Sequence, residues 1–217
     1  MLKQPCPLCA ATVCVFYFKD KKREYFQCET CKLIFVPRCF HLSKAEEKAE
    51  YDKHENAIDD EGYLRFLSRC ISPLLSIINT SPSVYKKGID FGCGPAPALA
   101  HEVRRQGYDM SIYDPYYFPD HEAIQRKYDF VTCTEVVEHF NEPAIDIAQL
   151  FSLLAEPAVL IVMTKLVINK ERFASWHYKN DPTHVCFYSK ETFEFIALQH
   201  KVAVEFIGSD VILFVNG

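Results

Sequence analysis

The feature that most constrains this chain is an apolar, strand-like run that opens directly into glycines. Tyr85-Lys-Lys-Gly-Ile-Asp-Phe91 leads into Gly92-Cys-Gly-Pro-Ala-Pro97, and a second short apolar run ends on Asp114, twenty residues past Gly94. Glycines at the tip of a buried parallel strand let the backbone approach a ligand, and the helix that follows directs its N–H groups at an anion. The carboxylate at the next strand tip can bind both ribose hydroxyls. This layout predicts a nucleoside site in a three-layer α/β fold, where the strand order reverses.

Two motifs that the chain lacks limit which nucleoside cofactor this site can bind. A pyrophosphate-binding GxGxxG requires a third glycine where this chain has Pro97, and no GxxxxGK[ST] phosphate loop occurs in the sequence. Both observations argue against a binding site for NAD or ATP. Asp90, just before the glycines, suits a ligand that carries an ammonium group. The ligand with an amine, a carboxylate and a ribose is S-adenosylmethionine.

Three segments now resemble a known family. Gly88-Ile-Asp-Phe-Gly-Cys-Gly94, Tyr113-Asp114 and Tyr128-Asp-Phe-Val-Thr-Cys-Thr-Glu-Val-Val-Glu-His-Phe140 are similar, in order and spacing, to class I S-adenosylmethionine-dependent methyltransferases, particularly the ubiquinone-biosynthesis O-methyltransferase-like branch. The resemblance covers roughly residues 85 to 215 and implies a Rossmann-like sheet. The cofactor-binding candidates are Asp90, Gly92, Cys93, Gly94, Asp114, Pro115, Tyr116, Cys133, Thr134 and Glu135. One departure is Ala96, where the family usually has a third glycine; alanine fits there only with a negative φ.

The interval after Asp114 is short for this family. Thirteen residues, Pro115 to Lys127, precede the buried strand predicted from Tyr128 to Cys133, and one parallel crossover takes about a dozen residues. We therefore expect the sheet to lack one parallel strand and Asp114 to end an edge strand. The family residue that usually contacts adenine after that strand would also be missing. Tyr116, Tyr117 or Asp120 could take its place, the tyrosines by stacking.

The N-terminal region carries a strong metal-binding pattern. Cys6-Pro-Leu-Cys9 and Cys28-Glu-Thr-Cys31 are two CxxC knuckles, the spacing of a structural zinc site with four thiolates. A hairpin is predicted between them, from residues 13–18 and 24–27, with a charged tip. Together these features predict a zinc ribbon, whose Zn²⁺ ligands are Cys6, Cys9, Cys28 and Cys31. Three further candidates lie off the pattern and are not expected to bind metal: Cys14, Cys39 and His41.

These patterns divide the chain into three parts: a zinc ribbon over residues 1–43, a helical connector and lid over 44–84, and a Rossmann-like methyltransferase domain over 85–217. Ser43 is a predicted helix cap. In related methyltransferases the segment before the core closes over the cofactor, so the resemblance makes Tyr51, His54 and Tyr63 lid candidates. An ordinary surface between domains explains them equally well.

The C-terminal half completes the predicted sheet. Pro143 starts a helix, residues 157–163 form a continuous apolar run typical of a buried strand, and Ser189 caps a last helix through His200. Residues 202–207 and 211–215 are expected to pair around Gly208-Ser209 as an antiparallel end of the sheet.

The catalytic candidates follow two predicted strands. Methyl transfer from a sulfonium is an in-line displacement, which requires an aligned acceptor and, for a neutral acceptor, removal of a proton. His139 follows the strand that ends at Cys133, although Glu138-His139 suits an orienting or capping role better. The loop from Trp176 to Ser189 is rich in His, Tyr and Asp, and resembles the substrate loop of the same branch. His184 and Tyr188 are the best candidates in this loop for a catalytic base. The alternative is that these side chains only pack in the core, and for His177 this packing role is favoured over a catalytic one.

Composition limits the class of partner. The chain has 217 residues, 49% of them hydrophobic, and a net charge of −5, divided as +5 over residues 1–44 and −10 over the remainder. The acidic main part makes nucleic acid an unlikely partner, because backbone binding requires a basic track. No signal-peptide pattern begins the sequence and no uncharged run approaches 18 apolar residues, so we expect a cytoplasmic protein without a membrane association.

The expected activity is methylation of a small-molecule acceptor at O, C or N. An RNA base methyltransferase and a noncatalytic zinc-ribbon interaction protein with a relict pocket remain alternatives. The sequence identifies neither the acceptor nor the oligomeric state.

Overall fold

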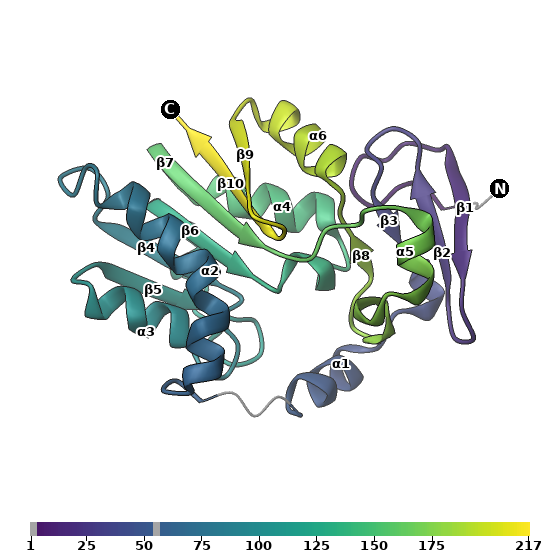
Figure 1. Ribbon diagram of the computed structural model, residues 1–217, viewed down its shortest axis with the longest axis horizontal. Helices are drawn as coiled ribbons and strands as arrows, with labels where there is room; N and C mark the ends of the chain where they lie inside the picture. The colour runs from purple at the N-terminus through teal and green to yellow at the C-terminus, as the bar shows by residue number, and fades with distance from the viewer. Residues whose placement is uncertain (1–3, 54–56) are drawn as a thin grey trace.

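A computed structural model describes residues 4–53 and 57–217. Two sheets organise the chain (Figure 1). The N-terminal elements are β1 (Cys14–Lys19), β2 (Glu24–Cys28), β3 (Ile34–Phe35), the 3₁₀ helix η1 (Arg38–Phe40), α1 (Lys44–Tyr51) and α2 (Glu61–Ile78). The remaining elements are β4 (Lys87–Phe91), α3 (Ala98–Arg105), β5 (Asp109–Tyr113), η2 (Ala123–Gln125), β6 (Tyr128–Thr134), η3 (Val137–His139), α4 (Pro143–Ser152), β7 (Leu154–Met163), α5 (Lys170–Ser175), η4 (His177–Asn180), β8 (Cys186–Phe187), α6 (Lys190–His200), β9 (Ala203–Ile207) and β10 (Val211–Asn216).

The larger sheet confirms the predicted α/β class. Its strand order is β5-β4-β6-β7-β10-β9. β4 pairs in parallel with β5 and β6, β6 with β7, whereas β10 runs antiparallel to both β7 and β9. The chain leaves β4 first toward β5 and then returns to β6 on the other side. The carboxyl ends of β4, β5 and β6 therefore meet where the strand order reverses, as expected for a ligand site.

The predicted loss of one parallel strand is also confirmed. β5 lies at the edge of the sheet, and residues 115–127, all of them described, contain no strand of the sheet. Between β5 and β6 the chain forms only an isolated bridge, Asp114 to Phe118, and η2. Thirteen residues are enough for this one crossover and leave no length for another strand.

Three layers form because the central strands alternate their side chains between two apolar faces. In β7, Val159, Ile161 and Met163 pack with α2 and α3, whereas Leu160 and Val162 pack with α4 and α6. Figure 1 shows these helices on opposite faces of the sheet. The continuous apolar run that predicted a buried strand therefore has a partner on both sides.

Caps set the predicted helix starts. Ser43 accepts from the Glu46 N–H and forms a capping box that begins α1, and Ser189 does the same for α6. The segment between residues 44 and 79 is helical in two pieces, α1 and α2. Among the described residues, no helix combines the length and apolar character needed to cross a membrane.

The ribbon sheet contains a strand that the sequence did not predict. β1, β2 and β3 form it with β8, which comes from the loop between β7 and α6 and pairs antiparallel with β3. Phe173 of α5 packs edge-on against Tyr17 and Tyr25 at centroid distances of 5.3 and 5.2 Å. One apolar cluster runs from Tyr25 to the interior of the large sheet. This sheet and the loop before α6 thus share a core; Figure 1 shows β8 beside β3.

Candidate active site

The glycine turn after β4 holds its backbone in a conformation that side chains disfavour. Gly92 has φ +77° and Gly94 has φ +63°, whereas Ala96 is not among the residues with positive φ, as its alanine side chain requires. A Cβ on Gly92 would lie 2.5 Å from Cγ2 of Val136, but a Cβ on Gly94 would have no atom within 4 Å. The Gly92 N–H donates to the Tyr113 carbonyl at 2.8 Å, which ties the turn to the end of β5.

Asp114 connects the two turns. Its Oδ2 accepts from the Gly94 N–H at 3.0 Å, and its Oδ1 accepts from the N–H groups of Tyr116 at 2.8 Å and Tyr117 at 3.1 Å. The side chain is buried at 7% exposure. Since a carboxylate has about four acceptor sites, the side chain keeps some acceptor capacity while its orientation is fixed.

Asp90, near the end of β4 before the glycines, is a deeply buried acid at this end of the sheet. Its Oδ1 accepts from the Thr132 hydroxyl at 2.7 Å, and the side chain is 2% exposed. Burial raises the pKa of Asp90 to about 6, partly opposed by the Thr132 hydrogen bond. A cation placed beside this carboxylate would favour its charged form.

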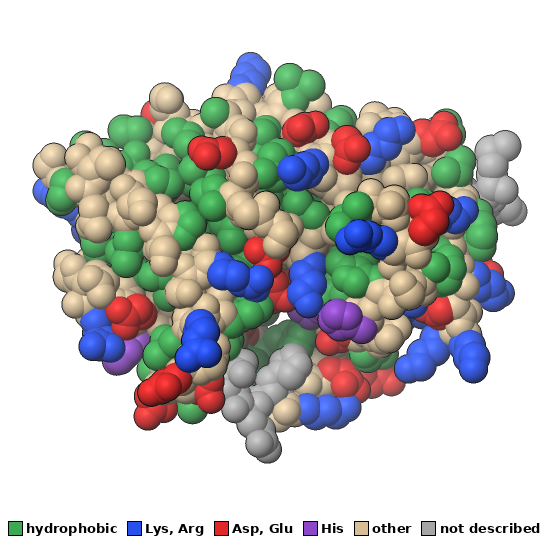
Figure 2. Space-filling view, in the orientation of Figure 1, with side chains coloured by type: hydrophobic (Ala, Val, Ile, Leu, Met, Phe, Trp, Pro, Cys, Tyr) green, Lys and Arg blue, Asp and Glu red, His purple; other side chains and the backbone are tan. Residues whose placement is uncertain are grey.

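A cavity of about 790 Å³ extends over these strand ends. Figure 2 shows a hollow on the viewed face, near its lower centre. Nine of the ten predicted cofactor residues line the cavity: Asp90, Gly92, Cys93, Gly94, Asp114, Pro115, Tyr116, Thr134 and Glu135. The tenth, Cys133, is fully buried and does not line it.

Two of the predicted lid residues line the same cavity. Tyr51 of α1 and Tyr63 of α2 contribute to its wall, and His54 lies outside the described residues. Glu47, also on α1, accepts from the hydroxyls of Tyr51 at 3.0 Å and Tyr116 at 2.5 Å. α1 is thereby bonded to the turn after β5. Of the three residues considered for adenine, Tyr116 and Tyr117 line the cavity and Asp120 does not.

The catalytic candidates His139 and His184 lie side by side although they are 45 positions apart in the sequence. Their ring centroids are 4.6 Å apart, and both rings line the cavity with Asp181. The Nε2 atom of His184 lies 3.8 Å from Oδ2 of Asp181. Burial lowers the pKa of His184 to about 4, so this imidazole is neutral at physiological pH.

Tyr188 is placed elsewhere, which corrects its selection as a base candidate. Its ring is fully buried and stacks on Phe193 at 5.0 Å, and its hydroxyl donates to the Val137 carbonyl at 3.1 Å. An apolar β8–α6 junction surrounds it, so packing, the alternative interpretation, accounts for this residue. His177 does not line the cavity, and its side chain is exposed rather than packed as favoured from the sequence.

Glu138 is buried at 0% exposure under the two imidazoles, where the sequence suggested an orienting or capping role. Its Oε1 accepts from the Tyr178 hydroxyl at 2.5 Å and its Oε2 from the Thr164 hydroxyl at 2.9 Å. Burial and then the carboxylate of Glu135 raise the pKa of Glu138 to about 8. Glu135 has φ +53° and a pKa raised by burial to about 7.

Comparison with known families identifies the fold and its chemistry. A family described as "Methyltransferase domain" matches residues 56–200. The chain belongs to this methyltransferase family. Comparison with curated proteins gives no match.

Solved structures agree on the fold of this methyltransferase. The 1,6-didemethyltoxoflavin-N1-methyltransferase of Burkholderia thailandensis aligns with a TM-score of 0.51 and 10% identity over 93% of this chain and 97% of that chain. An O-methyltransferase family protein from the same organism aligns with a TM-score of 0.52 and 12% identity over 87% of this chain and 65% of that chain. At these identities the likeness concerns the fold.

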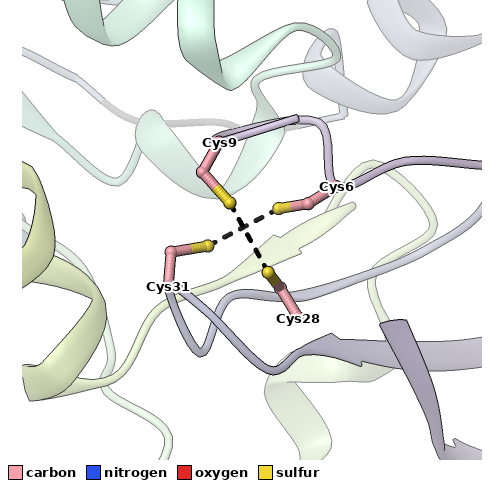
Figure 3. Close-up of side chains that lie close together, drawn as sticks. All are labelled: Cys6, Cys9, Cys28 and Cys31. Carbon is pink, nitrogen blue, oxygen red and sulfur yellow. Dashed lines mark hydrogen bonds between the residues drawn. The ribbon is translucent and has the colours of Figure 1, made fainter. Parts of the chain in front are cut away.

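The methyltransferase also carries the predicted cysteine cluster. The sulfur atoms of Cys6, Cys9, Cys28 and Cys31 all lie within 4.8 Å of one another and point toward a common centre (Figure 3). Two sulfur pairs, Cys6–Cys31 and Cys9–Cys28, are each 3.5 Å apart. Tetrahedral zinc with bonds of about 2.3 Å places sulfurs roughly 3.8 Å apart. Cys14, Cys39 and His41 are outside this group, as expected.

Sequence reasoning missed the residue that joins the N-terminal sheet to the loop that carries His184. The Arg23 guanidinium, 7% exposed, donates to the carbonyls of Lys179 at 2.5 Å, Asp181 at 2.9 Å, Pro182 at 3.0 Å and His184 at 2.9 Å. In the sequence Arg23 ends a charged hairpin tip, which predicts exposure. No local pattern indicates that a distant loop covers this side chain.

Proposed function

We propose that this methyltransferase transfers a methyl group from S-adenosylmethionine to a small-molecule acceptor. One observation carries the proposal: a single cavity is lined at once by the glycine turn, Asp114 and the His139–His184 pair. Its volume of about 790 Å³ is in the range of pockets that enclose a small organic ligand, roughly 300–1,000 Å³.

The cofactor residues have complementary chemistry for each part of S-adenosylmethionine, which supplies an electrophilic methyl group on its sulfonium. The buried Asp90 carboxylate suits the ammonium group, and the open side of Gly94 admits close backbone contact. Asp114 would accept hydrogen bonds from the ribose hydroxyls. Tyr116 or Tyr117 would contact adenine in place of the missing family residue, and Thr134 and Glu135 complete the wall beside the amino-acid portion.

The acceptor would bind against His139 and His184. Both imidazoles and Asp181 offer polar atoms that can orient a hydroxyl, an amine or a carbon acid. Proton removal from a neutral acceptor is assigned to this part of the cavity. α1, which is bonded to the turn after β5 through Glu47, would cover the reactants from water.

A small-molecule acceptor is favoured over RNA by charge and by one structural relative. The chain beyond residue 44 sums to −10, unsuited to a phosphate backbone. The 1,6-didemethyltoxoflavin-N1-methyltransferase is described with bound 1,6-didemethyltoxoflavin and S-adenosylhomocysteine, both small molecules.

We further propose that the cysteine cluster holds a structural Zn²⁺. Four thiolates complete a tetrahedron and leave no position for a substrate. The cluster would then stabilise the ribbon, and through Arg23 the loop that carries His184.

The decisive experiment for the function pairs binding with turnover. Calorimetric titration with S-adenosylhomocysteine should give one site per chain. Metabolite extract incubated with the protein and methyl-labelled S-adenosylmethionine should yield a labelled small molecule in mass spectrometry, and total RNA incubated in parallel should stay unlabelled. Labelled RNA without a labelled metabolite would instead favour the RNA base methyltransferase.

A further inference from the structure

A second group of potential metal ligands lies in the described part of the chain, apart from the cysteines. Ligand atoms of Glu138, His139 and His184 all lie within 4.8 Å of one another. Bonds of about 2.0–2.2 Å from a metal to nitrogen or oxygen place neighbouring ligand atoms roughly 3–4 Å apart. Side-chain shifts of about half an ångström or somewhat more would therefore bring the three atoms around one ion.

Both imidazoles are oriented as metal-binding histidines usually are. Nδ1 of His184 lies 2.7 Å from the Tyr178 carbonyl, and Nδ1 of His139 lies 3.3 Å from the Thr183 carbonyl. A carbonyl only accepts, so Nδ1 of each ring carries a hydrogen, and whenever the ring is neutral Nε2 has the lone pair. A backbone acceptor on the second ring nitrogen fixes the tautomer and rotation that a metal ligand requires.

The carboxylate is fixed in the same way. The hydroxyls of Tyr178 and Thr164 each donate to one oxygen of Glu138, which leaves further lone pairs on both oxygens. Tyr178 thereby supports two of the three residues, since its carbonyl also holds His184. Such outer contacts are usual around bound metals.

An independent observation also favours a cation at this end of the cavity. Oε1 of Glu135, three residues before Glu138 and on the cavity wall, is buried and has no hydrogen-bond partner among the described residues. An orphaned buried carboxylate oxygen is costly unless a cation or donor pairs with it. Its residue also has φ +53°, and backbone strain of this kind is concentrated at functional sites.

From this geometry we propose that Glu138, His139 and His184 bind one divalent transition-metal cation at the acceptor end of the cavity, with Glu135 beside it. Two imidazoles and one carboxylate suit Mn²⁺, Fe²⁺, Co²⁺ or Zn²⁺ and disfavour Ca²⁺. The cation would leave coordination positions toward the cavity for an acceptor oxygen or nitrogen. In that case the two histidines act on the acceptor through the metal. Metal binding does not require the cofactor, so it can be tested separately from the proposed function.

The test titrates Mn²⁺ into the full chain after zinc has been loaded into the cysteine site, because thiolates bind Mn²⁺ poorly. The loss of the free Mn²⁺ electron paramagnetic resonance signal counts bound ions. We expect one Mn²⁺ per chain, and affinity at least about tenfold lower in Glu138→Gln, His139→Ala and His184→Ala. His177→Ala removes an exposed histidine of the same loop and should leave Mn²⁺ affinity unchanged.

S-adenosylhomocysteine binding by each variant serves as the check that it is folded. The isosteric Glu138→Gln change can keep its contacts to Tyr178 and Thr164, so it provides the test if a histidine variant fails to fold. A zinc count after excess Zn²⁺ should give two ions per wild-type chain and one per Glu138→Gln chain. The proposal is wrong if neither metal occupies a second site, or if the second ion remains in all three ligand variants. Failure of S-adenosylhomocysteine binding alone would instead overturn the proposed function.

Discussion

Asp114 is the residue from which the cofactor assignment is most directly testable. Asp114→Ala should lower the affinity for S-adenosylhomocysteine by about tenfold to a hundredfold, because charge-assisted hydrogen bonds to ribose contribute about 1.5–3 kcal/mol. Asp109→Ala is the matched control, since Asp109 is exposed at the opposite end of the same strand. Calorimetry on both variants gives the measurement. Unchanged affinity in Asp114→Ala would remove the ribose assignment.

Asp90 should show a conflict between stability and binding. Its folded pKa of about 6 lies above the ordinary 3.8, so the folded state binds the proton more tightly and stability falls as the pH rises from about 4 to 6. Asp90→Asn should therefore raise the free energy of unfolding by about 2–3 kcal/mol at pH 7 and change it little at pH 4. Urea unfolding at the two pH values measures this.

The same Asp90→Asn variant should bind S-adenosylmethionine more weakly, because it loses the carboxylate that suits the ammonium group. Equal stability gains at both pH values would contradict the burial argument. Undiminished binding would separate Asp90 from the cofactor while leaving the stability argument intact.

The two glycines of the turn should differ in their tolerance of a side chain. Gly94→Ala places a residue at φ +63° without a contact, a strain of about 1–2 kcal/mol. Gly92→Ala adds an overlap with Val136 and should cost more, and Val136→Ala in the same chain should recover the difference. Thermal unfolding of the three variants provides the comparison, and equal losses in the two single variants would show that Val136 yields freely.

At the scale of elements, Arg23 joins the β1–β2 hairpin to the loop before β8. Arg23→Ala leaves four carbonyls without their donor and should lower the free energy of unfolding by about 2–4 kcal/mol. Arg23→Lys should recover only part of this, because an ammonium group cannot reproduce the planar fork of donors. Arg38 pairs with Glu142 on the surface, so Arg38→Ala should cost at most about 0.5 kcal/mol. A similar small loss for Arg23→Ala in urea unfolding would mean that water replaces the guanidinium.

The sequence predicted the elements whose signals are local. The strand–glycine turn, the two capping serines and the short interval after Asp114 each depend on neighbouring residues, and each prediction agrees with the structure. The CxxC spacing likewise predicted that the four cysteines lie together, as they do. β8 is two residues long and gains its identity only by pairing with β3, so no periodicity could indicate it. Tyr188 was misjudged for the same reason: an aromatic residue beside a histidine has the same local pattern whether it faces a cavity or the core.

At the scale of the whole molecule, the N-terminal sheet of β1, β2 and β3 forms part of the scaffold around the His139–His184 part of the cavity. β8 and the Arg23 contacts tie it to the loop that carries Asp181 and His184, and their apolar core is continuous. The basic part of the sequence, residues 1–44, and the acidic remainder are therefore not two independent folding units in the structure. Destabilising the N-terminal sheet should therefore also destabilise the loop that lines the cavity.

Zinc removal tests this coupling. A structural zinc site contributes directly to folding, and about forty residues cannot form a stable core without it. Chelation should therefore increase amide exchange over residues 4–36 and, because β8 pairs with β3, over residues 165–189 as well. β4, β6 and β7 have neighbours on both sides within the large sheet and should remain protected. Hydrogen exchange followed by mass spectrometry, with and without chelator, measures all three regions. Increased exchange confined to residues 4–36 would show that the loop carrying His184 holds its conformation without the N-terminal sheet. Protein that contains no zinc when purified without chelator would contradict the proposed zinc site.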